Sequence, residues 1–223
     1  IIGFDDEKKG AGGRVYDFAM ENAIPGVTFS MLQALPNTAL WDRLKVEGRL
    51  LDDANLNQTT LLNFVPSRPI EDIAEEYVEA FWNLYDPKNY LKRVYDHFMM
   101  VGQAKVHSDP ELRHKLRNQH KTDFDYRGIL FGLKMVWKLG FYYESRSVFW
   151  KYLYGMYKNN RGGIGNFLSF AAFLLHFLPY RKLVKKEIEE QLVLRLAGKV
   201  KVLNPEIELS EELQEDIKWY KAS

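Results

Sequence analysis

The first 63 residues and the rest of the chain differ in their pattern of apolar positions. Residues 1–4 and 27–34 are short apolar runs with β-branched and aromatic side chains, which is typical of buried strands. Residues 14–23, which lie between them, have apolar positions at helical spacing. Two strands joined by a helix predict a parallel, right-handed βαβ unit.

A polar turn, Leu35-Pro36-Asn37-Thr38, follows the second predicted strand. Pro36 ends the strand because it has no amide hydrogen for a ladder and fixes its own φ. Asn37 or Thr38 can cap the next helix, and Gly48 supplies that helix with a C-terminal end. In a barrel of parallel strands such a turn lies on the face where ligands bind. The same residues would also suit a turn that only connects a strand to a helix and binds no ligand.

Residues 52–63 are polar and predict an exposed loop. Residues 64–69 contain two prolines and predict an extended linker. Its last residue, Pro69, is suited to the first position of a helix. A long helical region is therefore expected from residue 70 onward.

The region after residue 69 shows helical periodicity. Residues 70–85 place an apolar stripe opposite a row of glutamates, and Asp86-Pro87 begins a second helix that reaches about residue 100. An antiparallel helical hairpin is the simple outcome. Further helices are predicted at residues 108–121, 124–140, 144–157, 165–178, 180–196 and 210–218, with a break at residues 161–163 and an end or kink at Pro179.

These elements predict a mainly α protein of the α+β class. Residues 1–63 would form the βαβ unit and a connecting loop, and residues 64–223 an α-helical domain. Residues 165–178 are the most hydrophobic stretch, but a helix of that length is too short to span a bilayer.

Residues 1–6 (IIGFDD), a helix and a strand that ends in ALPNTALWDRLKVEGRLL resemble the end of the catalytic barrel of radical-SAM enzymes. The narrower similarity is to cobalamin-type radical-SAM proteins with a helical C-terminal domain of unknown function, a group that includes hopanoid methylases. In that group GFIIGFD forms a late barrel strand, and PGT-L-x-RL-x-x-EGRLL follows the last one. Asn37 stands where the family usually has glycine. The resemblance covers roughly residues 1–103 and extends further only in general character.

The resemblance implies a site for S-adenosylmethionine at the end of the first strand. Radical-SAM proteins carry a Gly-x-Ile-x-Gly-x-x-Glu pattern there, which packs on the adenine. In this sequence Ile1 matches the isoleucine, Gly3 the second glycine and Asp6 the acidic residue, and Asp5 lies in the same loop. From the residues alone, Gly3 could equally relieve packing at a strand end, beside a solvated acidic loop at residues 5–7.

Gln33 is a polar side chain inside a predicted buried strand, so it needs a hydrogen-bond partner. Near the mouth of a barrel that partner could be a ligand, or it could be a backbone group; Ser30 has the same ambiguity. The candidate cofactor-binding residues are Ile1, Gly3, Asp5, Asp6, Gln33 and Asn37.

The chain has no cysteine, so it can form neither a disulfide nor a thiolate metal site. Radical-SAM chemistry uses three closely spaced cysteines to hold a 4Fe-4S cluster. The resemblance therefore implies a fragment that begins inside the barrel, and a chain opening on Ile1 without methionine favours the same interpretation. We expect it to hold no cofactor and to be inactive by itself. The parent would use S-adenosylmethionine and the cluster, with the use of cobalamin left open.

Five histidines give no metal-ligand pattern. His107, His114 and His120 lie at spacings of seven and six without a carboxylate at ligand spacing, and we interpret them as surface residues. His97 and His176 lie in apolar helices and are interpreted as core or rim residues. The sequence also has no serine or cysteine nucleophile motif and no phosphate loop. We predict no catalytic residue and no metal ligand.

Charge is distributed unevenly along the chain. The formal net charge is −6 for residues 1–104, +11 for residues 105–201 and −4 for residues 202–223. The basic middle section therefore faces an anionic partner, or it is neutralised by the other two sections.

Residues 124–180 also contain 17 aromatic side chains interleaved with lysine and arginine. They are explained by the core of an α-helical domain, by a patch that contacts a membrane surface, or by stacking on RNA. Nucleic acid is the least favoured partner because no nucleic-acid motif is present.

The function implied by the resemblance is methylation, or a related modification, of an unactivated carbon in a small-molecule or lipid substrate. An alternative of another class is a non-catalytic helical module, residues 64–223, that docks on a membrane surface or a protein partner. No signal peptide is visible at the start, and we expect a cytoplasmic protein, with or without peripheral membrane contact.

Overall fold

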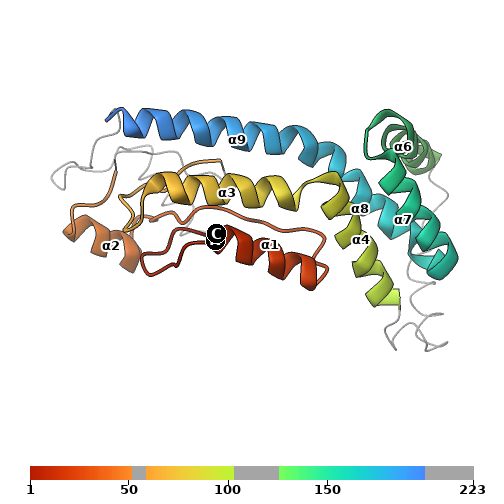
Figure 1. Cartoon of the computed structure of the whole chain (residues 1–223), viewed down its shortest axis with the longest axis horizontal. Coiled ribbons are helices and arrows are strands. Elements are labelled where there is room, and N and C mark those ends of the chain that lie inside the picture. Colours follow the sequence, from red (N-terminus) through yellow and green to blue (C-terminus); the bar gives the residue numbers. More distant parts are fainter. Residues whose placement is uncertain (52–58, 103–125, 199–223) are drawn as a thin grey trace. The chain divides into compact units, whose positions relative to one another are not determined.

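A computed structural model describes residues 1–51, 59–102 and 126–198, with side chains from residue 132 onward in the last range (Figure 1). The described part is mainly helical, as predicted. The helices are α1 (Ala11–Glu21), α2 (Ala39–Val46), α3 (Ile70–Leu84), α4 (Pro87–Gly102), α6 (Tyr126–Trp137), α7 (Arg146–Asn159), α8 (Ile164–Ala172) and α9 (Leu174–Leu196), with a π-helical segment η2 (Lys138–Tyr142) and a 3₁₀ turn η3 (Arg161–Gly163). The helices predicted at residues 108–121 and 210–218 lie outside these ranges.

The chain forms two compact units, each discontinuous in sequence. Unit 1 combines Ile1–Arg14, Thr28–Phe81 and Lys182–Ser223. Unit 2 combines Val15–Val27 and Trp82–Arg181.

The two predicted strands are reduced to a single parallel bridge between Ile2 and Met31 in unit 1. The Ile2 N–H donates to the carbonyl of Ser30 at 3.1 Å, and the Ile2 carbonyl accepts from Leu32 at 2.8 Å. The direction is parallel as predicted, but the described residues contain no strand, so the predicted βαβ unit is not seen. A regular two-stranded ladder is marginal without further strands beside it.

The turn before α2 has the predicted capping geometry. Thr38 is the N-cap, and its hydroxyl oxygen accepts from the Trp41 N–H at 3.3 Å. Beyond the other end, Gly48 has φ +64°, in the left-handed region that ends helices.

The prediction of an exposed loop is wrong for residues 59–63, which are buried. Asn63 donates to the Ala34 carbonyl and accepts from the Ala34 N–H, both at 2.8 Å. Gln191 of α9 accepts from the Leu61 N–H at 3.0 Å. Gln191 also donates to the Thr59 carbonyl at 2.8 Å. Polar side chains thus pair with backbone groups of this segment, and it can be buried despite its polar composition.

The apolar stripe predicted on α3 faces the core of unit 1. Ile73, Ala74 and Tyr77 are buried, and the Tyr77 hydroxyl donates to the carbonyl of Phe29 at 3.1 Å. Gly12 of α1 packs so closely on α3 that a Cβ there would lie 2.3 Å from the carbonyl oxygen of Glu76.

The core of unit 2 contains a buried arginine that the sequence pattern did not reveal. Tyr90, Leu91, Val94 and Phe98 of α4 are buried, and Arg93 on the same helix is 0% exposed. Its Nη2 donates to the Leu84 carbonyl at 2.7 Å, and its guanidinium lies 5.8 Å from the centre of the Tyr90 ring. A backbone carbonyl and a ring face therefore accompany this buried cation.

Pro179 does not end a helix, since α9 continues through it. The break lies earlier, at Phe173 between α8 and α9. The apolar stretch is thus part of a 36-residue helical run, Arg161–Leu196, which by length and composition alone could cross a membrane. Only 17% of its most apolar 18-residue window is buried inside the structure.

Candidate functional site

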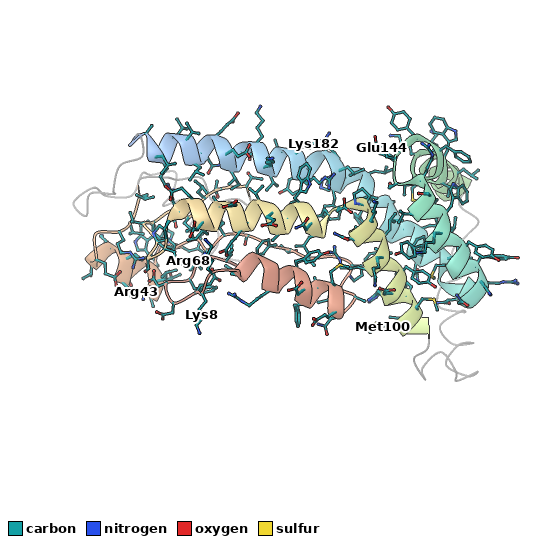
Figure 2. All side chains as sticks on the ribbon, viewed as in Figure 1. Lys8, Arg43, Arg68, Met100, Glu144 and Lys182 are labelled. Carbon is teal, nitrogen blue, oxygen red and sulfur yellow. The ribbon has the colours of Figure 1, made fainter. Side chains whose placement is uncertain are left out.

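Asp5 is the centre of an ion-pair cluster in unit 1. Arg49 approaches its carboxylate with both terminal nitrogens, with Nη2 2.5 Å from Oδ1 and Nη1 3.2 Å from Oδ2. Arg43 of α2, which is labelled in Figure 2, donates to Oδ2 at 2.6 Å. The Ser67 hydroxyl donates to Oδ1 at 2.8 Å. Asp5 therefore ties the N-terminal loop to α2, to Arg49 in the segment after α2, and to the linker before α3.

A second cluster lies around Arg68 (Figure 2). Its Nη2 is 2.5 Å from Glu76 Oε1, and its Nη1 is 3.7 Å from Glu7 Oε2. Glu76 also accepts from the backbone N–H groups of Gly10 at 2.8 Å and Ala11 at 3.0 Å. These donors begin α1, where helices have N–H groups without an intrahelical partner and favour a negative charge. Glu76 therefore fixes the start of α1 on α3.

The partners of Asp5 and Glu76 favour the ionised form of these two carboxylates. The hydrogen bond from Arg49 lowers the pKa of Asp5 to about 2, against the opposing effect of burial. Burial alone would raise the pKa of Glu76, but the Gly10 N–H and Arg68 outweigh it and the pKa is lowered. A general acid at neutral pH needs a raised carboxyl pKa, so these groups are suited to holding the loop in place.

Gly3 follows the bridge residue and has φ +105°, in the region that favours glycine. Its N–H donates to Glu7 Oε2 at 2.8 Å. A Cβ at this position would lie 2.6 Å from Cδ2 of Leu62. Backbone conformation and packing on Leu62 therefore account for glycine here, and contact with a cofactor stays a prediction.

Gln33 is the candidate with an incompletely satisfied side chain. Its Nε2 donates to the carbonyl of Leu61 at 2.9 Å. Its Oε1 is buried and, within the described residues, has no hydrogen-bond partner. A hydrogen-bond donor from a ligand could pair with this oxygen, because buried polar atoms are nearly always hydrogen-bonded. The backbone partner expected as an alternative is thus present for one end of the amide.

The other three candidates are exposed. Ile1 is 63% exposed beside the bridge, and Asp6 is exposed in the loop whose neighbour Asp5 is paired. Asn37 lies at the turn before α2 with φ +63°. Glycine and asparagine are the residues that adopt this conformation most readily, so the turn keeps its shape although the family usually has glycine there. The structure thus brings the N-terminal loop and Gln33 to one segment, residues 61–62, and places Asn37 at the start of α2.

The sequence interpretation missed the arginines that position this loop. Arg43, Glu47 and Arg49 stand at the charged positions of the RL-x-x-EGRLL pattern, and Glu47 lies 2.8 Å from Arg49. The motif residue Asp5 is the common partner of Arg43 and Arg49. A signal for this pairing was therefore present in the sequence, because the IIGFDD motif carries the aspartate and the RL-x-x-EGRLL motif carries the two arginines. Their separation of more than 35 residues hid the pairing.

No group of three or more His, Asp or Glu side chains that could hold a metal ion occurs within the described residues. His97 lies edge-on to the ring of Phe98, and His176 stacks on the ring of Tyr180. His107, His114 and His120 lie outside the described residues.

The chain is similar to known proteins over most of its length. The sequence pattern of a domain of unknown function, DUF4070, matches residues 38–190. An uncharacterized methyltransferase from Synechocystis sp. is 47% identical over 194 residues, which are 86% of this chain and 34% of that protein. A hopanoid C-2 methylase from Rhodopseudomonas palustris is 28% identical over 183 residues, which are 82% of this chain and 32% of that protein.

The chain therefore spans about a third of the length of these two relatives. No solved structure matches it. The resemblance to proteins of the hopanoid-methylase-like group is confirmed, and the match over residues 38–190 shows that the chain belongs to the DUF4070 family.

Proposed function

We propose that this chain is the C-terminal region of a larger radical-SAM methylating protein, to which it contributes the last segment of the barrel and the helical domain. The observation that carries the proposal is the similarity, over more than four fifths of the chain, to one protein named a methyltransferase and another named a methylase. The substrate class we infer is a small molecule or lipid with an unactivated carbon.

The residues of this chain do not fit a 4Fe-4S cluster, because the sequence has no cysteine. In this proposal the cluster is held elsewhere in the parent protein. There, the cluster and S-adenosylmethionine supply the radical chemistry and the methyl group.

The side chain that fits S-adenosylmethionine best is Gln33. Its Oε1, which has no partner among the described residues, can accept from a donor such as the exocyclic amine of adenine. The ion pairs of Asp5 and Glu76 would hold the neighbouring loop, with Gly3 and Asp6, in a fixed position.

The test uses the whole protein that contains this region, purified without oxygen and with its cluster reconstituted. We expect transfer of the isotope label from S-adenosylmethionine labelled in its methyl group to a product in an extract of small molecules and lipids. Gln33→Leu should raise the KM for S-adenosylmethionine, while Asn22→Ala, at an exposed site in unit 2, should leave it unchanged.

Two results would contradict the proposal. One is a parent protein that transfers no label and forms no cleavage product of S-adenosylmethionine. The other is binding of S-adenosylmethionine to the 223-residue chain alone, measured by equilibrium dialysis, because we propose that this region holds no cofactor by itself.

A second candidate function is a non-catalytic helical module that docks on another surface. The observation in its favour is the large exposed aromatic side chains of unit 2, such as Trp137 and Tyr142. This function would be favoured if a parent protein lacking residues 64–223 kept its activity in detergent but lost it on a membrane-bound substrate.

A further inference from the structure

Unit 2 carries an outer stripe of three large apolar side chains on α6 and η2: Leu133, Trp137 and Phe141. They follow one another at intervals of four residues, which places them on one side of the helix. They are 61%, 61% and 60% exposed, and the next residue, Tyr142, is 71% exposed. Figure 2 shows side chains extending outward from this end of the unit, around the labelled Glu144.

The outward direction of the stripe is fixed by packing on the opposite side. Met135 and Leu139 are 3% and 0% exposed. The indole Nε1 of Trp150 donates to the Gly140 carbonyl at 2.8 Å, and a Cβ on Gly140 would lie 2.8 Å from the same ring. Glycine within the π-helical segment thus admits Trp150, whose ring meets Phe141 edge-on at 5.7 Å. These contacts hold α6 and η2 with the stripe facing solvent.

Positive charge accompanies the stripe. Lys134 and Lys138 each follow a stripe residue directly and are exposed. Between residues 132 and 181 the sequence has seven lysines and arginines but one acidic residue, Glu144. An anionic surface that meets the stripe would therefore also meet the positive charges of Lys134 and Lys138.

We propose that the outer stripe is an interfacial anchor for a membrane surface that contains anionic phospholipids. Tryptophan and tyrosine favour the boundary between headgroups and acyl chains, and adjacent lysines add attraction to anionic lipids. A stable protein–protein interface buries a larger area than a stripe on one helix face offers. Peripheral binding to a lipid surface, by contrast, can be achieved by a few aromatic rings together with basic side chains. This inference does not depend on the proposed radical-SAM function; it deepens the second candidate function by naming an anionic membrane surface as the partner.

The test is sedimentation of the 223-residue chain with sucrose-loaded vesicles of phosphatidylcholine alone or mixed with phosphatidylglycerol. We expect binding to the anionic vesicles that weakens with salt. Trp137→Ala with Phe141→Ala should reduce the partition coefficient at both low and high salt. Lys134→Glu with Lys138→Glu should reduce it by roughly 20-fold or more at low salt, since each basic residue near such a surface contributes about five-fold.

Matched variants separate the stripe from general effects of the substitutions. Phe18→Ala removes an aromatic side chain of 60% exposure on α1, beside the acidic residues Asp17 and Glu21. Lys8→Glu with Lys45→Glu makes the same change of charge at exposed positions of unit 1. Both controls should bind vesicles nearly as well as the unchanged chain. Circular dichroism of every variant shows whether the helices are retained.

Several outcomes would overturn the proposal. The first is failure of the unchanged chain to bind any vesicle, and the second is equal binding to neutral and anionic vesicles. A third is loss of binding in Phe173→Ala, at an exposed site between α8 and α9, with retention in the stripe variant. A fourth is a concentration-dependent dimer in sedimentation velocity that the stripe variant abolishes, because the stripe would then join two copies of the chain.

Discussion

Asn63 forms both backbone hydrogen bonds of Ala34 with its side chain, at 2.8 Å each. One amide group thus gives Ala34 the donor and the acceptor that a neighbouring strand would have supplied. The backbone of Asn63 is used separately, since its carbonyl accepts from the Leu51 N–H at 3.0 Å. Asn63 therefore connects the segment after the parallel bridge with the segment before α3.

The first prediction follows from that contact. Asn63→Ala leaves two buried backbone groups of Ala34 unpaired and should lower the unfolding free energy by about 2–4 kcal/mol. Urea denaturation measures this loss, and hydrogen exchange should show reduced protection of the Ala34 amide. Asn22→Ala, at an exposed site, serves as the control. A loss below about 0.5 kcal/mol, typical of surface substitutions, would mean that these bonds do not hold the segment.

The second prediction concerns pH. The folded pKa of Asp5 is about 2 and its ordinary value is 3.8, so ionised Asp5 stabilises the folded state. The stabilisation, about 1–2 kcal/mol, is complete above the unfolded value and is lost as pH falls from about 4 toward 2. Asp5→Asn should therefore be less stable than the unchanged chain at pH 6 and approach it near pH 2.

Urea titrations at several pH values measure this difference. Asp6→Asn, at an exposed position in the same loop, should shift stability by less than about 0.5 kcal/mol at pH 6. If the difference between Asp5→Asn and the unchanged chain is constant from pH 6 to pH 2, the ion pair with Arg49 is not its cause.

The third prediction uses two adjacent glycines in α1. Gly12→Ala would place a Cβ 2.3 Å from the Glu76 carbonyl oxygen, which is backbone and cannot rotate away. We expect a loss of about 1–3 kcal/mol as α1 and α3 move apart. At Gly13 nothing lies within 4 Å of an added Cβ. Gly13→Ala should therefore stabilise the helix by about 0.5–1 kcal/mol.

Thermal unfolding of the two variants gives a comparison with opposite expected signs. If both substitutions stabilise the protein, α1 does not pack on α3 at Gly12 as the structure has it.

The fourth prediction concerns the turn before α2. Asn37 has φ +63°, a conformation that costs other residues with a side chain roughly 1–2 kcal/mol. Asn37→Ala should lower stability by about 1 kcal/mol, while Asn37→Gly should be neutral within a few tenths. Urea denaturation of the pair measures this, and equal effects of alanine and glycine would contradict a left-handed Asn37.

The helices of this protein could be predicted well from the sequence, for reasons that particular residues illustrate. Thr38 before α2 and Pro87 at the start of α4 are local signals, and both mark the observed starts. Pro179 did not end the helix although it occupies an interior position of α9, where a proline removes one i→i−4 hydrogen bond; the helix breaks at Phe173 instead, which local propensity does not show. The burial of residues 59–63 depends on Asn63 and Gln191 reaching partners far along the chain, which local composition does not show.

The sequence by itself determined the family, the mainly helical content and the absence of any thiolate ligand, since these depend on residue identity and short spacings. Only the tertiary structure decided that Asp5 is held by Arg49 and Arg43, that Gly3 packs on Leu62, and that Arg93 is buried. The ion pairs of Asp5 and the packing of Gly3 on Leu62 join residues whose separation in the chain leaves no periodic signal. Their energies arise from burial and charge pairing, which exist only once distant segments have met.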